Sequence, residues 1–452
     1  MTTVNQSSSN YILDTSREYS IYVCENRAIP KVADGLKDAQ RKALWLLKNR
    51  ADKIKTVSLA GMMISENLYL HGDQSAAGAV SMLAAPYVNN IPLLDGIGSF
   101  GTRVAPVDGI GAPRYTYVKR GKAAQELMFP DMDIVPVKEN YDGSTIEPQH
   151  FLPIIPTVLL NGVSGIAVGW STEILPRSFK SLVQATLDVL DGKKLKRIAP
   201  SYELYDIGVK HLEENSWEFS GKVQIIDTST IKITELPPDL TLEKFKERLN
   251  TYEDENRISM YTDRSTDTIN ITIKMARGAC KGWNEARAID YFKLKQKKTE
   301  RIVVIDWNGS SIRQYESAEQ LIQDFVEWRL GWYATRYEHK VERDSYELGF
   351  WEGVKLCFDD KLPARLGSIA DRATLDADVQ KVTTKLKLDD KRIDRIVNLP
   401  AHRWTKDAYK QVLEKIKELK ANIKEYNRIL KDPEARKSLY REEVEALKKV
   451  KF

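Results

Sequence analysis

The stretch from Ala318 to Phe358 contains no proline, and only Gly331 and Gly349 interrupt its helical pattern. A single helix of roughly 40 residues extends about 60 Å, which is more than one compact domain accommodates. We therefore expect this stretch to run beyond the domain in which it begins.

A second long helix is predicted near the end of the chain. Its apolar residues recur at alternating spacings of four and three, which is the seam of a coiled coil, before Pro433 ends it. These residues are Val412, Ile416, Leu419, Ile423, Tyr426 and Leu430. Two long helices with a small helical segment between them predict a long antiparallel coiled-coil stalk.

The rest of the chain divides into two regions with different sequence patterns. A chain of 452 residues is too long for one hydrophobic core. Residues 1–145 include two successive predicted helices, one after Asp34 and one near Asp73, which favour a winged-helix (helix-turn-helix) domain. Residues 146–315 carry short β-like runs between turn residues and predict an α/β domain. With the stalk in residues 316–452, the predicted fold class is α+β multidomain.

Composition narrows the classes of protein. The net charge of +5 comes from 69 basic and 64 acidic residues, so any nucleic-acid surface has to be local. The three cysteines lie far apart without a CxxC, which favours a reduced intracellular protein over a disulfide scaffold or zinc site. The first ten residues lack an export signal, and prolines and glycines break up the apolar residues 151–170. We expect a cytoplasmic protein without a membrane partner.

One tyrosine has a setting that suits phosphate chemistry. Tyr115 follows Arg114 directly on a glycine-rich, basic segment, residues 96–120. A phenol has a pKa of about 10, so it attacks a phosphodiester only where cations stabilise the phenolate and the charge that develops on phosphorus. Taken alone, Tyr115 would be assigned to an ordinary strand, where it alternates with Tyr117, one of them in the core and the other outside.

Two other motifs carry less weight. The glycines of GxGxxG, Gly96–Gly101, precede a proline rather than the helix that a dinucleotide site requires. Asp131 and Asp133 form a DxD between two prolines without a third carboxylate, which predicts a solvated turn rather than a magnesium site.

Taken in order, eight segments resemble the DNA breakage and rejoining subunit of type IIA DNA topoisomerases. They are Asn26–Trp45 (NRAIPKVADGLKDAQRKALW), Leu70–Ala76 (LHGDQSA), Leu93–Arg103 (LLDGIGSFGTR), Ala112–Val118 (APRYTYV), Asn140–Ser144 (NYDGS), Ile155–Thr172 (IPTVLLNGVSGIAVGWST), Ile233–Pro238 (ITELPP) and Asp324–Arg329 (DFVEWR). Within that family the chain looks most like the short, split versions of T-even-like bacteriophages. The resemblance covers most of the chain and implies a winged-helix domain, a tower domain for residues 146–315 and a dimerisation region on the stalk.

The resemblance also implies roles for particular residues. Tyr115 would be the nucleophile that opens one DNA strand and stays linked to its 5′ phosphate, while Tyr115 of a second copy cuts the other strand. Arg114, Arg41 and His71 fall on family positions around the scissile phosphate, where cations and hydrogen-bond donors stabilise charge in phosphoryl transfer.

Three further residues are implied to contact DNA. Arg27 and Lys42 would contact the backbone. Ile166, between Gly165 and Ala167, falls on the position that wedges between base pairs and bends the duplex. An isoleucine met without that context would be assigned to the core.

The family's metal-binding carboxylate cluster has no counterpart in this sequence. Mg²⁺ and the ATPase are therefore expected on a separate partner subunit, with no metal site in this chain. A homodimer is expected because one tyrosine per chain has to cut two strands. The chain ends without room for a C-terminal wrapping domain, so relaxation and decatenation are expected rather than negative supercoiling.

Two alternatives fit parts of the sequence. A tyrosine recombinase also forms a phosphotyrosine but needs an HxxR motif, and no histidine here has arginine three residues later. A non-catalytic dimer that binds and bends double-stranded DNA would keep the basic helices and the stalk. It would not need an arginine beside Tyr115.

Overall fold

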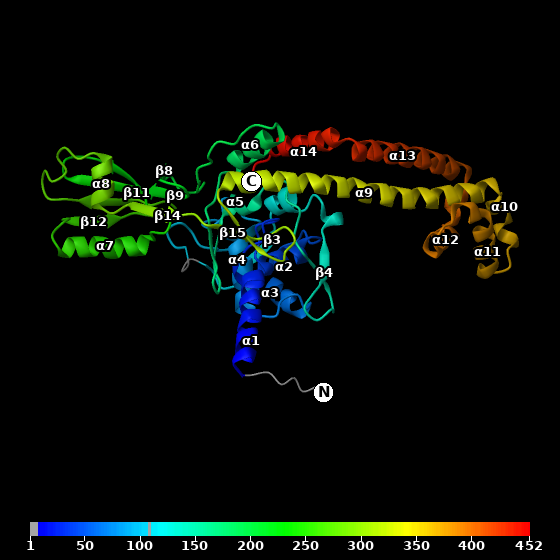
Figure 1. The fold of residues 1–452 in the computed structure, drawn as a ribbon, viewed down its shortest axis with the longest axis horizontal. Coiled ribbons are helices and arrows are strands. Elements are labelled where there is room, and N and C mark those ends of the chain that lie inside the picture. The colour runs from blue at the N-terminus through cyan, green and yellow to red at the C-terminus, as the bar shows by residue number, and fades with distance from the viewer. Residues whose placement is uncertain (1–7, 107–109) are drawn as a thin grey trace. The chain divides into compact units, whose positions relative to one another are not determined.

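The computed structural model describes residues 8–106 and 110–452. The chain forms two compact units, one of Met1–Arg329 with Glu443–Phe452 and the other of Leu330–Glu442. Figure 1 shows the order of their elements along the chain.

The first unit contains three helices that pack on one another beside a small antiparallel sheet with strand order β1-β3-β2. These elements are α2 (Asp38–Leu47), α3 (Thr56–Ser65), α4 (Asp73–Ala84), β1 (Ile54–Lys55), β2 (Leu94–Ile97) and β3 (Tyr117–Arg120). Their apolar faces are buried, with Leu44, Leu59 and Val80 fully covered. Strand β3 is central, so Val118 pairs with Ile54 on one side and Gly96 on the other.

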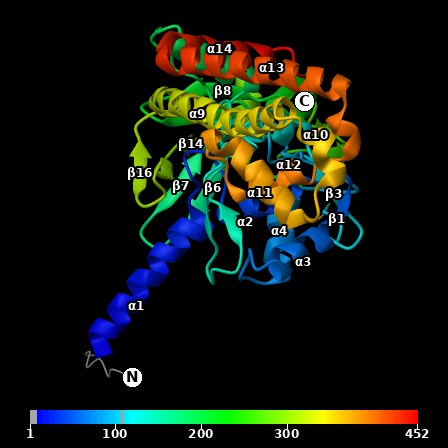
Figure 2. The same ribbon diagram turned by 90° about the vertical axis from the view of Figure 1, so that its right-hand side faces the viewer.

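The chain enters this helical layer through α1 (Ser8–Val23) and a π-helical turn (Cys24–Ala28). In both views α1 leads away from the rest of the first unit (Figures 1 and 2). The turn is anchored because Cys24, Ala28 and Ile29 pack against Val303 and Ile305. Burial of these residues anchors the chain at the C-terminal end of α1.

Short elements link the helical layer to the next sheets. They are the helical turns Ala124–Met128 and Met132–Ile134, then β4 (Val137–Glu139), β5 (Ile146–Pro148), α5 (Thr157–Asn161), β6 (Val163–Ile166), β7 (Ser171–Ile174) and α6 (Phe179–Leu190). Strands β4 and β5 form one hairpin and β6 and β7 another. The predicted domain boundary after residue 145 falls inside the first hairpin.

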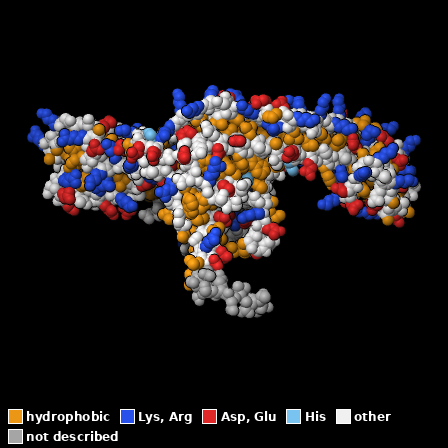
Figure 3. Space-filling view, in the orientation of Figure 1, with side chains coloured by type: hydrophobic (Ala, Val, Ile, Leu, Met, Phe, Trp, Pro, Cys, Tyr) orange, Lys and Arg blue, Asp and Glu red, His pale blue; other side chains and the backbone are white. Residues whose placement is uncertain are grey.

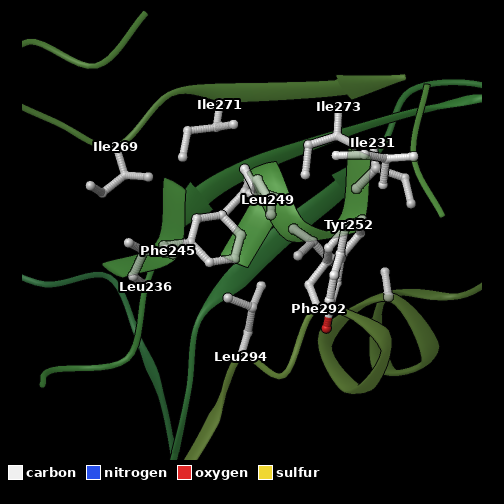
Figure 4. Packing of buried hydrophobic residues seen from close by; sticks show 14 of the residues in the cluster. Ile231, Leu236, Phe245, Leu249, Tyr252, Ile269, Ile271, Ile273, Phe292 and Leu294 are labelled. Atoms are coloured by element: carbon white, nitrogen blue, oxygen red, sulfur yellow. The ribbon is translucent and has the colours of Figure 1, made fainter. Parts of the chain in front are cut away.

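A four-stranded antiparallel sheet, with order β10-β11-β13-β12, forms the second core of this unit. Its apolar face packs against α7 and α8, with Phe245, Leu249 and Phe292 between them (Figure 4). The elements of this region are β8 (Gly208–His211), β9 (Ser216–Ser220), β10 (Lys222–Ile225), β11 (Thr230–Glu235), α7 (Leu242–Asp254), β12 (Met260–Asp263), β13 (Ile271–Lys274), α8 (Glu285–Tyr291), β14 (Lys295–Thr299), β15 (Ile302–Ile305) and β16 (Ile312–Tyr315). The predicted short strands are therefore confirmed.

The predicted long helix is confirmed as α9 (Ala318–Asp359). The other helices are α10 (Leu362–Arg365), α11 (Arg372–Thr383), α12 (Asp390–Val397), α13 (Lys406–Lys431) and α14 (Pro433–Leu447). Within the second unit α9 and α13 run antiparallel, since Tyr337 lies 5.6 Å from Tyr426 between ring centroids and the hydroxyl of Tyr409 donates to Asp359 at 2.8 Å. Pro433 separates two helices by opening α14, a position that tolerates its missing N–H.

One expectation about Asp131 is wrong. Its carboxylate is not in a solvated turn, because Asp131 is 5% exposed and pairs with the buried guanidinium of Arg329. Arg329 also donates to the carbonyl of Pro153 at 3.0 Å. A buried carboxylate requires such a partner, so Asp131 serves packing, whereas Asp133 is exposed.

Candidate active site

Tyr115 lies in a turn, Pro113–Tyr115, that ends just before strand β3. Its side chain is 70% exposed. The backbone N–H of Tyr115 donates to the carbonyl of Ala112 at 2.8 Å, and the guanidinium carbon of Arg114 lies 4.9 Å from the centre of the phenol ring. The turn thus presents a phenol and an adjacent cation to solvent.

The residue after Tyr115 holds the turn in place. Thr116 is buried, and its hydroxyl lies 2.8 Å from that of Thr56. The backbone N–H groups of Thr56 and Val57 donate to the carbonyls of Thr116 and Pro113, at 3.0 and 3.1 Å. Because Thr116 points inward, Tyr115 is turned outward on a fixed support.

A second group of candidate residues gathers beside the π-helical turn. Nη2 of Arg27 lies 2.9 Å from Nδ1 of His71, and the hydroxyl of Tyr22 lies 2.6 Å from Nε2. The ring of Tyr69 packs against the imidazole edge to face, with centroids 5.1 Å apart. His71 is therefore fixed from three sides.

The surroundings of His71 favour its neutral form. Burial and the charge of Arg27 lower the pKa of His71 below its ordinary value. With the proton on Nε2, the imidazole donates to Tyr22 while Nδ1 accepts from Arg27. A neutral imidazole carries only this one N–H, so it can donate to an anionic oxygen only by exchanging its hydrogen bond to Tyr22, while Arg27 adds a full charge beside it.

Arg27 and His71 line a cleft of about 1030 Å³ that also takes in Lys37, Arg103 and Lys298. Tyr115 is not among the described residues that line it. Within one chain the cleft therefore collects cations and a histidine without the exposed phenol.

Arg41 does not lie at an open surface, contrary to its predicted contact with the scissile phosphate. It is 1% exposed, with Nε and Nη2 donating to the carboxylate of Asp34 at 2.7 and 2.9 Å and Nη2 also donating to the carbonyl of Leu36 at 2.7 Å. Burial alone would raise the pKa of Asp34, but the charge and hydrogen bonds of Arg41 lower it below its ordinary value. This geometry gives Arg41 a structural role in holding the segment after Arg27.

Lys42 is similarly occupied. It is 9% exposed, and Nζ lies 2.8 Å from Asp38 and 2.9 Å from Glu147. Its charge is therefore compensated inside the protein. A direct contact between Lys42 and a DNA phosphate would need both acidic partners to give way.

Ile166 is the most exposed large apolar side chain among the described residues, at 85%. It ends strand β6, and the turn to β7 is closed by a hydrogen bond from the N–H of Ala167 to the carbonyl of Trp170 at 2.8 Å. Val168 and Trp170 are also exposed, at 59% and 43%. The hairpin tip thus presents three apolar side chains to solvent.

A glycine explains why this hairpin sits beside the π-helical turn. A Cβ on Gly165 would lie 2.0 Å from the carbonyl oxygen of Ala28. Lys37 adds a second tie, since its Nζ donates to the carbonyl of Ser164 at 2.8 Å. The apolar tip and Arg27 are therefore held close together.

Three residues of this site were not predicted from the sequence motifs. Tyr22 lies in α1, outside every matching segment, so only its contact with His71 reveals it. Val168 and Trp170 lie inside the Ile155–Thr172 segment, but their exposure depends on the hairpin geometry.

The glycine-rich segment before Tyr115 serves a tight loop. A Cβ on Gly96 would lie 2.5 Å from the ring of Phe100, and Gly98 has a φ of +106°. These glycines allow backbone approach within the protein, which accounts for them without a bound nucleotide.

The charge of the surface is mixed, with basic and acidic side chains interspersed over the face seen in Figure 3. Among residues 8–106 and 110–452, no three histidine, cysteine or acidic side chains gather as they would around a metal ion. No helix in these same residues has the length and apolar character needed to cross a bilayer.

Comparison with known proteins gives a consistent result. The family model for the A subunit of DNA gyrase/topoisomerase IV matches residues 27–445. The DNA topoisomerase medium subunit of Enterobacteria phage T4 is 30% identical over 426 residues, which covers 91% of this chain and 93% of that protein. DNA topoisomerase 2-alpha of Gallus gallus is 34% identical over 69% of this chain, but the match covers only 21% of the longer protein.

A solved structure supports the fold. The DNA-binding, cleavage and re-ligation domain of Plasmodium falciparum topoisomerase II superposes with a TM-score of 0.84 at 24% identity, covering 95% of this chain and 63% of that one. Given the extent of the family match, the chain belongs to the A-subunit family of DNA gyrase and topoisomerase IV, which are type II DNA topoisomerases.

Proposed function

We propose that this chain is the DNA cleavage and religation subunit of an ATP-dependent type II DNA topoisomerase. It opens both strands of one duplex so that another can pass through, giving relaxation and decatenation. The observation that carries the proposal is the exposed phenol of Tyr115 beside Arg114, on a turn anchored by buried Thr116.

The proposed reaction is a transesterification at phosphorus. The phenolate oxygen of Tyr115 attacks, a bond forms between that oxygen and the 5′ phosphate, and the bond to the 3′ oxygen breaks. The phenol gives up its proton to solvent as it attacks, and the released 3′ oxygen takes up a proton from solvent. Religation is the reverse step, and because the covalent bond conserves the energy of the phosphodiester, closure needs no further cofactor.

Stabilisation of the phosphoryl oxygens falls to Arg114, Arg27 and His71. Donors held in place before reaction supply most of the stabilisation of developing charge in such steps. Arg27 and His71 are held in place by each other and by Tyr22. Arg41 takes a positioning role in this scheme, because Asp34 occupies its guanidinium.

The separation of Tyr115 from the cleft supports a homodimer in which two chains complete each site. Arg27 and His71 line the cleft, whereas Tyr115 does not. Tyr115 of one copy would therefore meet the cleft of the other, and two such sites would cut two strands. Helices α9 and α13 with the small helices between them would form a coiled-coil stalk and a dimerisation region.

The apolar tip of hairpin β6–β7 would bend the double-stranded DNA. An exposed isoleucine can enter a base step and unstack it, and Val168 and Trp170 would widen the wedge. Helices α2 to α4 with the sheet β1-β3-β2 would act as a winged-helix domain on the same duplex.

Mg²⁺ and ATP belong to a separate partner subunit in this proposal. The described residues do not fit a Mg²⁺ site, since no cluster of carboxylates forms among them. The T4 relative is named a medium subunit, which supports a multi-subunit enzyme. By the same likeness the enzyme would act in the cytoplasm of a bacterial host.

The test is to mix the chain with its partner subunit, Mg²⁺ and DNA, denature the mixture, and search for protein-linked 5′ ends. Tyr115→Phe should abolish the adduct. Tyr117→Phe, two residues away in strand β3, is the matched control and should retain it. A dimer that only bends DNA would give no adduct with any variant, and adducts with Tyr115→Phe would refute the assignment.

A further inference from the structure

We propose that Arg103 is a positioning residue, which locks a loop before Tyr115 (its described residues, 98–106 and 110–112) onto the four-stranded sheet. The inference rests on the proposed cleavage function. It joins two segments that the sequence singles out without a role, the end of Leu93–Arg103 and Ile233–Pro238, which lie about 130 residues apart and meet in the structure.

Arg103 makes a set of directed contacts. Its Nε donates to Oε1 of Glu235 at 3.2 Å, and Nη2 donates to the carbonyls of Leu236 and Pro237 at 3.0 and 3.3 Å. Its guanidinium carbon also lies 4.6 Å from the ring centre of Tyr205. The side chains of Arg103 and Glu235 are only 10% and 9% exposed. A charge pair that is this well buried and hydrogen-bonded fixes one geometry.

The residues beside Arg103 tighten the same junction. Val104 packs against the apolar core under the four-stranded sheet. Gly101 has a φ of +83°, and a Cβ there would lie 2.5 Å from both the carbonyl oxygen of Pro106 and the ring of Tyr87. The hydroxyl of Tyr205 in turn donates to the carbonyl of Tyr87. The loop is therefore held by this sheet through Arg103 and Val104, and by Tyr87 and Tyr205 outside the sheet.

The other end of the loop supports the tyrosine turn. The N–H of Gly111 donates to the carbonyl of Ser99 at 2.9 Å, and Phe100 forms an antiparallel bridge with Ile110. A Cβ on Gly111 would lie 3.0 Å from Cγ2 of Thr116, the buried neighbour of Tyr115. A continuous set of contacts thus runs from Glu235 through the loop to the support of Tyr115.

These contacts would set the position of the Tyr115 phenol when DNA is bound. A misplacement of about 1 Å in a reacting group can lower a rate about 100-fold. Strand β11, which ends at Glu235, belongs to a rigid core, so the sheet can hold the loop in one position. Loosening Arg103 should therefore harm cleavage far more than DNA binding.

The experiment compares Arg103→Ala with Lys246→Ala in the assembled enzyme. Lys246 forms an ion pair with Asp263 at 3.1 Å within the four-stranded region, so it is a matched control that leaves the loop alone. Arg103→Ala should lower the covalent complex at least about 10-fold while DNA affinity stays within about 2-fold. Amide hydrogen exchange across residues 110–117 should become faster in Arg103→Ala and stay unchanged in Lys246→Ala.

Equal behaviour of the two variants in cleavage and exchange would overturn the inference. A parallel loss of DNA affinity and cleavage would also overturn it, because Arg103 would then be contacting DNA. If Arg103→Ala fails to fold, Arg103→Lys and Glu235→Gln take its place. Amide hydrogen exchange and cleavage at wild-type levels in both of these variants would count against the inference. If the proposed function itself were wrong, the wild-type protein would form no covalent complex, which is a different result from those that overturn the role of Arg103.

Discussion

Arg41 and Asp34 form a buried pair, with Nε of Arg41 2.7 Å from one carboxylate oxygen of Asp34. The same carboxylate accepts the N–H of Phe151 at 2.9 Å, a residue far along the chain. The pair therefore ties the segment after Arg27 to a distant part of the first unit.

Removing one partner of this pair should destabilise the first unit. Arg41→Ala leaves the carboxylate of Asp34 buried without its cation, which costs about 3–5 kcal/mol of unfolding free energy. Urea unfolding followed by fluorescence measures the change. Arg428→Ala, which breaks an exposed ion pair with Glu425 on α13, is the control and should leave stability nearly unchanged. An Arg41→Ala protein of wild-type stability that no longer cleaves DNA would instead support a direct contact with phosphate.

Stability should fall on acidification because of His150. This residue is 6% exposed, and burial lowers its pKa to about 4. The unfolded chain, with a histidine pKa of about 6.5, binds more protons between these two values, so stability decreases as pH falls from about 6.5 to about 4, by up to about 3 kcal/mol. Urea unfolding at a series of pH values measures this slope, and His150→Gln should flatten it. An unchanged slope in that variant would show that His150 is not the group responsible.

Arg27 and His71 should matter more for cleavage than for binding. Loss of one preorganised donor to developing charge lowers the rate about 100-fold or more. Arg27→Ala and His71→Ala are each expected to lower the rate of covalent complex formation by that factor, with DNA affinity changed far less. Lys193→Ala, at an exposed lysine that pairs with Asp191 at 3.0 Å away from the cleft lining, is the control. Variants that weaken binding and cleavage equally would assign Arg27 and His71 to DNA affinity alone.

Ile166 should control bending. Ile166→Ala removes the most exposed apolar side chain of the hairpin tip, so the bent fraction of a fluorescently labelled duplex should fall at least about 5-fold. Folding should be unaffected because the side chain is not buried. Leu413→Ala, at an apolar residue exposed on α13, should leave bending unchanged. Wild-type bending by Ile166→Ala would rule out the wedge.

Much of the secondary structure follows from local sequence. A helical pattern without proline between residues 318 and 358 predicts α9, since nothing there interrupts the backbone hydrogen bonds of a helix. The short strands of the four-stranded sheet were predictable from β-branched runs between turn residues.

Which charged residues are buried in ion pairs was harder to predict. Arg41 and Lys42 look like a basic patch, but Asp34, Asp38 and Glu147 neutralise them after folding. Glu147 comes from a strand about 100 residues later, so only the tertiary structure reveals this pairing. The exposure of Ile166 likewise depends on a hairpin tip, while the local pattern of small and apolar residues suits a core.

The most direct test of the central claim is to identify the residue joined to DNA. Covalent complexes would be trapped by denaturation, digested with nuclease and protease, and analysed by mass spectrometry. We predict a nucleotide attached through its 5′ phosphate to the peptide that contains Tyr115. A nucleotide on any other residue, or on the 3′ side of the break, would contradict this assignment.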